Sequence, residues 1–306
     1  MAQINITTVL TQEMMTYYER VFLERAKVQI VNEQGFQKRT HPKNQGKTIN
    51  FTRQEPLALA TTALAEASNP SPSAITASTV AATLVEYGAA TTHSRLLSLT
   101  SIDEGMKEVI ESFGQNMGET INALAGNTLA CGTAFFPNGR NVSSVTTGDV
   151  LDASACVYTV QALELARAMP YPDGFYLGKT TIQNKPTLLN DSTWINSKTY
   201  SDVKDLYKGE MGELYQIRWL LNGQTVSGNG NAGAAACTSV LYYSYVHGRE
   251  SAGAVKLEGD MPKLYITQGA DSGNIANRLT YIAWAGSYVS VLLNSNWAQV
   301  IKAVAA

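Results

Sequence analysis

The first clear pattern of apolar positions lies in residues 11–31, where apolar side chains recur at helical spacing. They are Met14, Met15, Tyr18, Val21, Phe22 and Ala26, with Thr11 suited to the N-cap. This spacing predicts an amphipathic helix. The next residues, 32–45, are polar and show no period, so we expect a flexible tether that lets the helix fold back or reach a neighbouring molecule.

Two segments with β-type patterns flank a stretch rich in turn residues. Residues 46–53 alternate polar and apolar positions, residues 76–92 are rich in Thr and Val, and the sequence between them contains SNPSPS. Two limbs of about 20 residues make a hairpin roughly 60 Å long. A compact chain of this length has a radius of gyration of about 19 Å. We therefore expect the hairpin to curl or to extend onto another molecule.

The strongest helical pattern follows a capping box at residues 101–104. Its apolar positions are Met106, Val109, Ile110, Phe113, Met117, Ile121 and Leu124. A helix over 102–131 would be about 45 Å long. Gly114, Gly118 and Gly126 lie inside it, which indicates bending or close packing against another segment.

The second half of the chain predicts mixed structure. We expect a helix over 149–169 that ends at Pro170 and Pro172, because proline cannot continue a helix. Strands at 175–182 and 214–221, short helices at 185–193 and 200–208, and a Gly/Asn loop at 222–236 follow. The last seventy or so residues predict strands at 240–245, 261–267, 279–285, 288–293 and 299–304.

Composition narrows the classes of function. Only 16% of the residues are charged and 44% are hydrophobic, which fits a subunit covered by copies of itself, since interface cores are depleted of charge; an ordinary neutral globular protein fits as well. The formal net charge of -2 lacks the basic excess of a nucleic-acid clamp. Cys131, Cys156 and Cys237 are odd in number and far apart, and we interpret them as small buried hydrophobes.

No targeting segment is evident. The N-terminus lacks a basic region followed by an apolar run, and no run of about 18 apolar residues occurs. We therefore expect a protein made and used in the cytoplasm, without membrane partners and without a cleaved N-terminal scaffolding segment.

Candidate chemistry is weak. Residues 228–233 match GxGxxG, but a strand rather than a helix is predicted after them, so a flexible loop is favoured over a dinucleotide site. His41, His93 and His247 lack the spacing of a metal or catalytic set. Glu104, Glu108 and Glu111 fit a solvated helix face. We expect no enzyme activity, no metal and no cofactor.

Four segments carry a resemblance. They are YERVFLERA at 18–26, PKNQGKTINF at 42–51, YPDGFY at 171–176 and GEMG at 209–212. Together with the order of predicted elements, they resemble the major capsid protein family typified by coliphage N-four, which has the Hong Kong 97-type fold. The chain departs from the family at 222–236 and at 184–186.

The resemblance implies an α+β fold in five parts: an N-terminal arm (1–45), an extended E-loop (46–95), a spine helix with part of the peripheral domain (96–145), an axial domain (146–255), and C-terminal peripheral strands (256–306). It implies a structural subunit that forms pentamers and hexamers of an icosahedral phage head, in the virion. An encapsulin-like nanocompartment shell of the same fold is the alternative.

The implied partners are further copies of the chain, a portal, scaffolding proteins, decoration proteins as a further option, and packaged double-stranded DNA contacted weakly. The residues expected at contacts between subunits are Tyr18, Phe22, Arg25, Phe51, Arg53, Pro70, Pro72 and Tyr87. Those expected at the exposed tip of the axial domain are Asn222, Gly228, Gly230 and Gly233.

Overall fold

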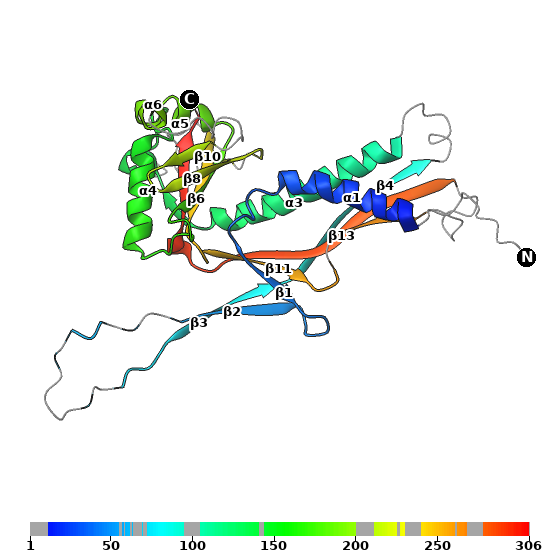
Figure 1. Ribbon diagram of the computed structural model, residues 1–306, viewed down its shortest axis with the longest axis horizontal. Coiled ribbons are helices and arrows are strands. Elements are labelled where there is room, and N and C mark those ends of the chain that lie inside the picture. The colour runs from blue at the N-terminus through cyan, green and yellow to red at the C-terminus, as the bar shows by residue number, and fades with distance from the viewer. Residues whose placement is uncertain are drawn as a thin grey trace, which may run out of the picture.

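The computed structural model describes residues 12–54, 57, 59–61, 63, 69, 72–94, 105–140, 144–199, 211–224, 227–229, 240–260, 262–267 and 278–305. These residues form two lobes and a projecting hairpin (Figure 1). We call them the spine lobe, built on the longest helix, and the α4 lobe. The expected α+β class is confirmed.

The spine lobe consists of two helices over a five-stranded sheet (Figure 1). The helices are α1 (Gln12–Gln29) and α3 (Gly105–Ala130). The strands run in the order β1 (Gln37–His41), β11 (Ala252–Leu257), β13 (Leu279–Leu292) and β12 (Lys263–Thr267), and β4 (Val85–Ser94) also pairs with β13. Its core is built from buried side chains such as Ile110, Ile121 and Trp284.

The close approach of α1 to α3 depends on two glycines. A Cβ at Gly114 would lie 2.5 Å from the carbonyl oxygen of Phe22, and one at Gly118 would lie 2.6 Å from that of Ala26. Since real Cβ atoms do not approach so closely, only glycine permits this packing. Of the two expected roles for these glycines, the structure shows close packing.

The α4 lobe is a seven-stranded sheet with helices. The strands run in the order β5 (Thr133–Phe135), β14 (Ala298–Val304), β10 (Val240–His247), β6 (Tyr176–Thr181), β8 (Ile217–Asn222) and β7 (Gly212–Leu214), and β9 (Ser227–Asn229) also pairs with β10. The helices are α4 (Ala153–Leu165), α5 (Lys185–Leu189) and α6 (Ser192–Thr199), with 3-10 turns at Pro137–Gly139 and Ser295–Trp297.

The α4 helix is shorter than the predicted 149–169. It begins after Asp152, whose carboxylate accepts a hydrogen bond from the amide of Ala155 at 2.8 Å and so caps the helix. Asp149 instead accepts bonds from Asn138 and Thr146, at 2.8 and 2.7 Å, and holds the preceding loop. The helix ends at Leu165, and Arg167 has a φ of 52°, so the chain leaves the helix before either proline.

Strand boundaries also differ from the predictions. Residues 32–45 are not a plain tether, because they include β1, which pairs in parallel with β11. The single strand expected over 76–92 is two strands, β3 (Ala77–Thr83) and β4, because β4 pairs with β13 over ten positions. Residues 214–221 contain the end of β7, a turn and most of β8, whereas 279–293 hold the one strand β13.

Some predictions fall outside the described residues. These are the capping box at 101–104, the N-cap Thr11, the helix at 200–208, and Cys237. Of the other cysteines, Cys156 is buried as expected, but Cys131 is exposed at the end of α3, which corrects that part of the prediction. Among the described residues, no helix is long and apolar enough to cross a membrane.

Candidate assembly surfaces

A hairpin of β2 (Thr48–Gln54) and β3 projects from the body of the molecule (Figure 1). Its two strands pair at seven positions, from Thr48 with Thr83 to Gln54 with Ala77. Phe51 anchors its base: the ring is 3% exposed and packs on Gly253 of β11, where a Cβ would lie 2.7 Å from it. The hairpin is therefore rooted firmly at one end.

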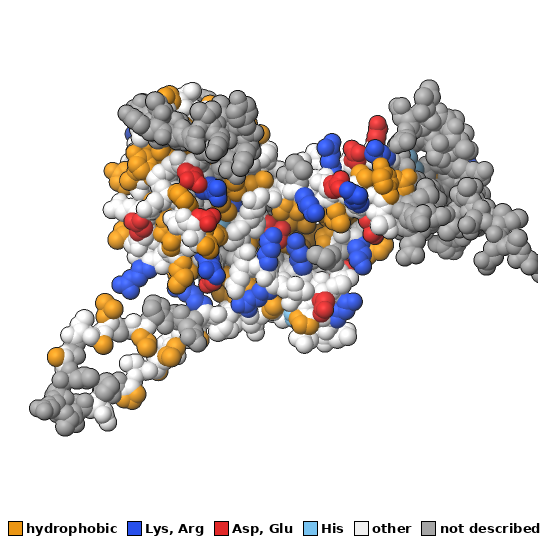
Figure 2. All heavy atoms as spheres, viewed as in Figure 1, with side chains coloured by type: hydrophobic (Ala, Val, Ile, Leu, Met, Phe, Trp, Pro, Cys, Tyr) orange, Lys and Arg blue, Asp and Glu red, His pale blue; other side chains and the backbone are white. Residues whose placement is uncertain are grey.

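Beyond this base, the described large apolar side chains are exposed and pack little against the rest of the chain. Leu57, Leu59 and Ile75 are 56%, 74% and 61% exposed, and Figure 2 shows hydrophobic side chains scattered along the projecting loop. In the sequence, residues 54–84 contain two Glu, Glu55 and Glu66, and no Asp, Lys or Arg. The described apolar side chains of the projecting part are thus available to a partner.

A groove of about 720 Å³ lies at the base of the hairpin. Its lining includes Arg39, Arg53 and Arg167 but only one acidic residue, Glu250. The Arg39 guanidinium stacks 4.4 Å from the centre of the Phe51 ring, and that of Arg53 lies 5.2 Å from the Trp297 ring. These contacts place positive charge beside apolar surface.

The sequence around this groove is basic. Residues 38–53 hold five Lys or Arg and no Asp or Glu, although the chain as a whole has a formal net charge of -2. The basic segment that contributes to the groove is thus followed in the sequence by a segment whose charged residues, Glu55 and Glu66, are acidic.

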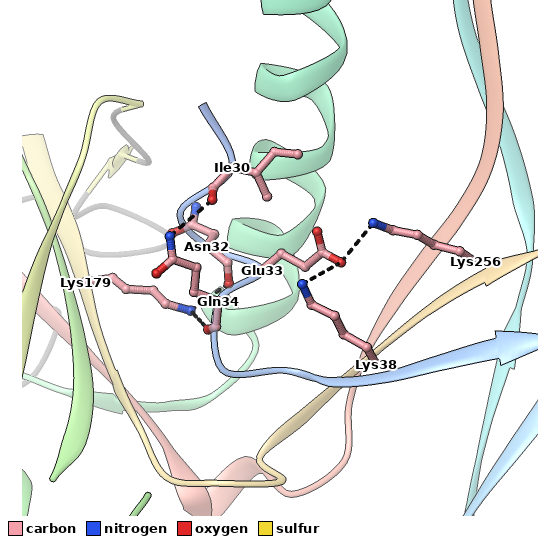
Figure 3. A network of polar contacts seen from close by, with 7 residues as sticks. All are labelled: Ile30, Asn32, Glu33, Gln34, Lys38, Lys179 and Lys256. Atoms are coloured by element: carbon pink, nitrogen blue, oxygen red, sulfur yellow. Dashed lines mark hydrogen bonds and ion pairs between the residues drawn. The ribbon is translucent and has the colours of Figure 1, made fainter. Parts of the chain in front are cut away.

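A buried polar network lies where the two lobes meet (Figure 3). Its centre is the turn after α1, residues 30–36. The Asn122 side chain of α3 accepts hydrogen bonds from the amides of Val31 and Asn32, at 3.0 and 2.7 Å. It also donates to the side chains of Asn222 and Gln224, each at 2.9 Å. The Asn122 amide therefore joins the turn to the end of β8 and to the residues that follow it.

Lys179 of β6 reaches the same turn. Its side chain is 1% exposed, and its ammonium donates to the carbonyl oxygens of Asn32 and Gln34 at 2.6 and 2.8 Å. Burial lowers the pKa of Lys179 well below its usual value, against the opposing charge of Glu33. Glu33, also buried, pairs with Lys256 at 3.3 Å and Lys38 at 3.8 Å.

The predicted contact residues differ in accessibility. Phe22 and Phe51 are buried in their own chain at 1% and 3% exposure, which removes their side chains from a surface role. Tyr18 and Tyr87 are half-buried. Three further residues retain accessible surface or lie in the groove: Arg25, Arg53 and Pro72. Pro70 lies outside the described residues.

The predicted tip residues are not all at a tip. Asn222 is 2% exposed and belongs to the buried network, so its assignment to an exposed tip is wrong. Gly228 lies in β9 and pairs with Leu241. Gly230 and Gly233 lie outside the described residues. Gly228 is thus part of a strand pair, and the next described residues, β10, are again a strand rather than the helix of a dinucleotide site.

Sequence reasoning missed Asn122 and Lys179. Asn122 sits beside the apolar positions Ile121 and Leu124 of the predicted helix, and this polar residue on an apolar face was the available signal. Lys179 has no comparable signal, because a lysine in a strand ordinarily points to solvent.

The histidines do not assemble a site. His247 is fully buried, with Nδ1 3.1 Å from the Ser251 hydroxyl and 3.2 Å from that of Tyr171. Burial and the charge of Lys179 lower the pKa of His247 well below its usual value. Within the described ranges, no group of three His, Cys, Asp or Glu side chains is placed to hold a metal ion.

Comparison with solved structures relates this architecture to known proteins. The chain is similar to the capsid of Ralstonia phage GP4, with a TM-score of 0.70, 12% identity, and coverage of 100% of this chain and 96% of that one. It has the Hong Kong 97-type capsid fold. For the capsid of cyanophage P-SCSP1u the TM-score is 0.62 at 15% identity, over 90% and 89% of the two chains.

The capsid fold recurs in a third similar structure, the capsid of Helicobacter pylori bacteriophage KHP30, with a TM-score of 0.64, 10% identity, and coverage of 90% and 89%. No family model and no curated protein matches the chain. The fold expected from the resemblance is therefore confirmed, and the narrower likeness to the coliphage N-four family stays a prediction.

Proposed function

We propose that this chain is the structural subunit of a phage head, and that copies of it form the pentamers and hexamers of a closed icosahedral shell around double-stranded DNA. One observation carries the proposal: the capsid fold extends over the whole chain rather than over one lobe. The projecting hairpin supports it, because exposed apolar side chains on an extension gain by burial against a neighbour.

The hairpin and the groove supply complementary surfaces for that contact. The groove carries arginines beside Val80, Met169 and Trp297, and the distal hairpin carries acidic and apolar residues without a basic one. We therefore place the distal hairpin of one copy in the groove of the next. Because such a contact joins two different surfaces, it propagates from copy to copy and closes into rings.

Deleting residues 67–74 tests the role of the hairpin. The described residues among them, 69 and 72–74, belong to no strand, so the variant should fold with its melting temperature nearly unchanged but remain as small oligomers. Sedimentation and negative-stain microscopy measure this. Replacing the same residues with an equal number of Gly and Ser is the matched control, because it preserves the reach of the hairpin. Normal shells from the deletion variant would contradict the proposed overlap.

Charge reversal tests the groove. Arg53→Glu should reduce the yield of shells, and adding Glu66→Lys in the hairpin should restore part of it. Lys47→Glu is the control, since Lys47 belongs to the same basic segment but does not line the groove. If Lys47→Glu and Arg53→Glu reduce assembly equally, general charge rather than the groove is responsible.

An encapsulin-like shell with the same fold is the alternative. It would enclose a cargo protein, whereas a phage head encloses DNA. Nuclease-protected DNA in particles from infected cells supports the phage head, and a co-purifying enzyme with no protected DNA would favour the alternative. The near-neutral charge of the chain suits weak contact with DNA that must leave the shell. Portal, scaffolding and decoration proteins complete the proposed set of partners.

A further inference from the structure

The turn at residues 30–36 is held from three directions, and Figure 3 shows the contacts made by Lys179 and Lys256. From the spine helix, the side-chain oxygen of Asn122 accepts hydrogen bonds from two backbone amides of the turn. From the five-stranded sheet, Lys256 of β11 pairs with Glu33. From the α4 lobe, Lys179 donates to two of its carbonyls, and the Asn222 side chain donates to that of Asn32 at 3.3 Å. Its position is thus fixed by both lobes at once.

The lobes are also joined by the Tyr171 hydroxyl, which donates to the carbonyl oxygen of Gly35 in the turn at 2.8 Å, and by strands that lie between the two cores. In β10, Tyr245 packs in the core of the spine lobe and Val246 in that of the α4 lobe. In β14, Val300 and Ile301 divide in the same way. Apolar packing of this kind is not directional. The hydrogen bonds of the turn are directional, so they can specify how the seven-stranded sheet lies against the spine helix.

Of the residues that make these contacts, Lys179 is the one whose presence is explained least by its contribution to the stability of the fold. A buried ammonium carries a large desolvation cost, and apolar residues of similar volume often serve stability equally well or better. Both hydrogen bonds shown for its ammonium go to carbonyl oxygens of the turn and none to its own lobe. The Phe36 ring, whose centre lies 5.0 Å from the ammonium, also belongs to the turn. A lysine here connects the lobes rather than strengthening either one.

We propose that Lys179 is a positioning residue that fixes the angle between the two lobes, and that through this angle it sets the curvature of the assembled shell. The second part rests on the function proposed above. A subunit whose lobes meet at a variable angle presents its contact surfaces in several directions. The shells it forms then vary in diameter.

The test compares Lys179→Met with Lys38→Met. Methionine keeps the volume of the side chain but removes both hydrogen bonds to the turn. Lys38 is the matched control, because its ammonium also faces Glu33, at 3.8 Å, while its side chain is 64% exposed. In the unassembled subunit, hydrogen exchange at the amides of Val31 and Asn32 should become about tenfold faster in Lys179→Met, with α4 unaffected. Lys38→Met should leave hydrogen exchange unchanged both in the turn and in α4.

Electron microscopy then measures the particles. Lys179→Met should give a broader or shifted distribution of diameters, and Lys38→Met the distribution of the unaltered chain. Unchanged exchange in the turn would overturn the inter-lobe role. Faster exchange with unaltered diameters would overturn the link to curvature. If the unaltered chain forms no shells at all, the proposed function fails, while the exchange result still decides the role of Lys179.

A second variant covers the case in which Lys179→Met does not fold. Asn222→Ala removes a second side chain of the α4 lobe that donates to the turn and leaves the lysine in place. It should show faster hydrogen exchange in the turn and an altered distribution of particle diameters, both to a smaller extent than Lys179→Met. Exchange and diameters equal to those of the unaltered chain would overturn the proposal independently of Lys179.

Discussion

The packing of α1 on α3 gives a sharp prediction, because the two helices touch through backbone atoms. We expect the double variant Gly114→Ala and Gly118→Ala to destabilise the chain although alanine favours helix. Each substitution gains about 1 kcal/mol of helix propensity. Each added methyl also lies 2.5–2.6 Å from a carbonyl oxygen of α1, and overpacking of this kind costs about 1–3 kcal/mol.

The outcome depends on how α1 responds. Two backbone carbonyls cannot move aside without lifting the helix, and lifting it exposes Phe22, whose burial is worth about 2–3 kcal/mol. We therefore expect a net loss of about 2 kcal/mol, measured by urea denaturation, and faster hydrogen exchange across α1. Ser112→Ala is the control, since Ser112 is exposed on the same helix. If the double variant is as stable as the control, the helices do not pack as described.

Three further predictions concern single side chains. Asn122→Ala should cost about 2–4 kcal/mol in urea denaturation, because it leaves buried backbone amides unpaired. Burial raises the pKa of Asp149, but hydrogen bonds from Asn138 and Thr146 and the charge of Arg140 outweigh it, so this pKa lies below the usual 3.8. The carboxylate therefore contributes stability above that pH that is lost as the pH falls through the lowered pKa, and Asp149→Asn should reduce the difference in melting temperature between pH 6 and roughly pH 3; an unchanged difference would contradict the assignment. A thiol reagent should label exposed Cys131 in the native chain but Cys156 only after unfolding, because burial raises the pKa of the Cys156 thiol and blocks access to it.

The sequence predicted best where a pattern is local. The apolar spacing of residues 105–130 identified α3, and the glycines inside it correctly indicated close packing, because both signals lie within one helix. The turn residues between 54 and 76 correctly separated two strands that now form the projecting hairpin. The order of the elements then suggested a fold that structural comparison confirms.

Prediction failed where a distant partner decides the local structure. Residues 37–41 have no strand pattern, and they are extended because β11, more than 200 positions later, supplies the pairing. Leu84 separates two strands, β3 and β4, because the residues after it pair with β13. The sequence predicted Asn222 to be a loop residue in a Gly/Asn stretch, but its side chain is buried and forms hydrogen bonds with those of Asn32 and Asn122. No single-segment pattern records such partners.

The path of β13 and β14 has a consequence for how the chain is made. Both sheets include strands from residues 279–304. Strands β4 and β11 pair with β13, and strands β5 and β10 pair with β14. Neither sheet is complete until this stretch has left the ribosome, so most of the chain is synthesised before its long-range pairs can form. A growing chain therefore carries unpaired strand edges, and chaperones that cover such edges during synthesis should raise the yield of soluble subunits.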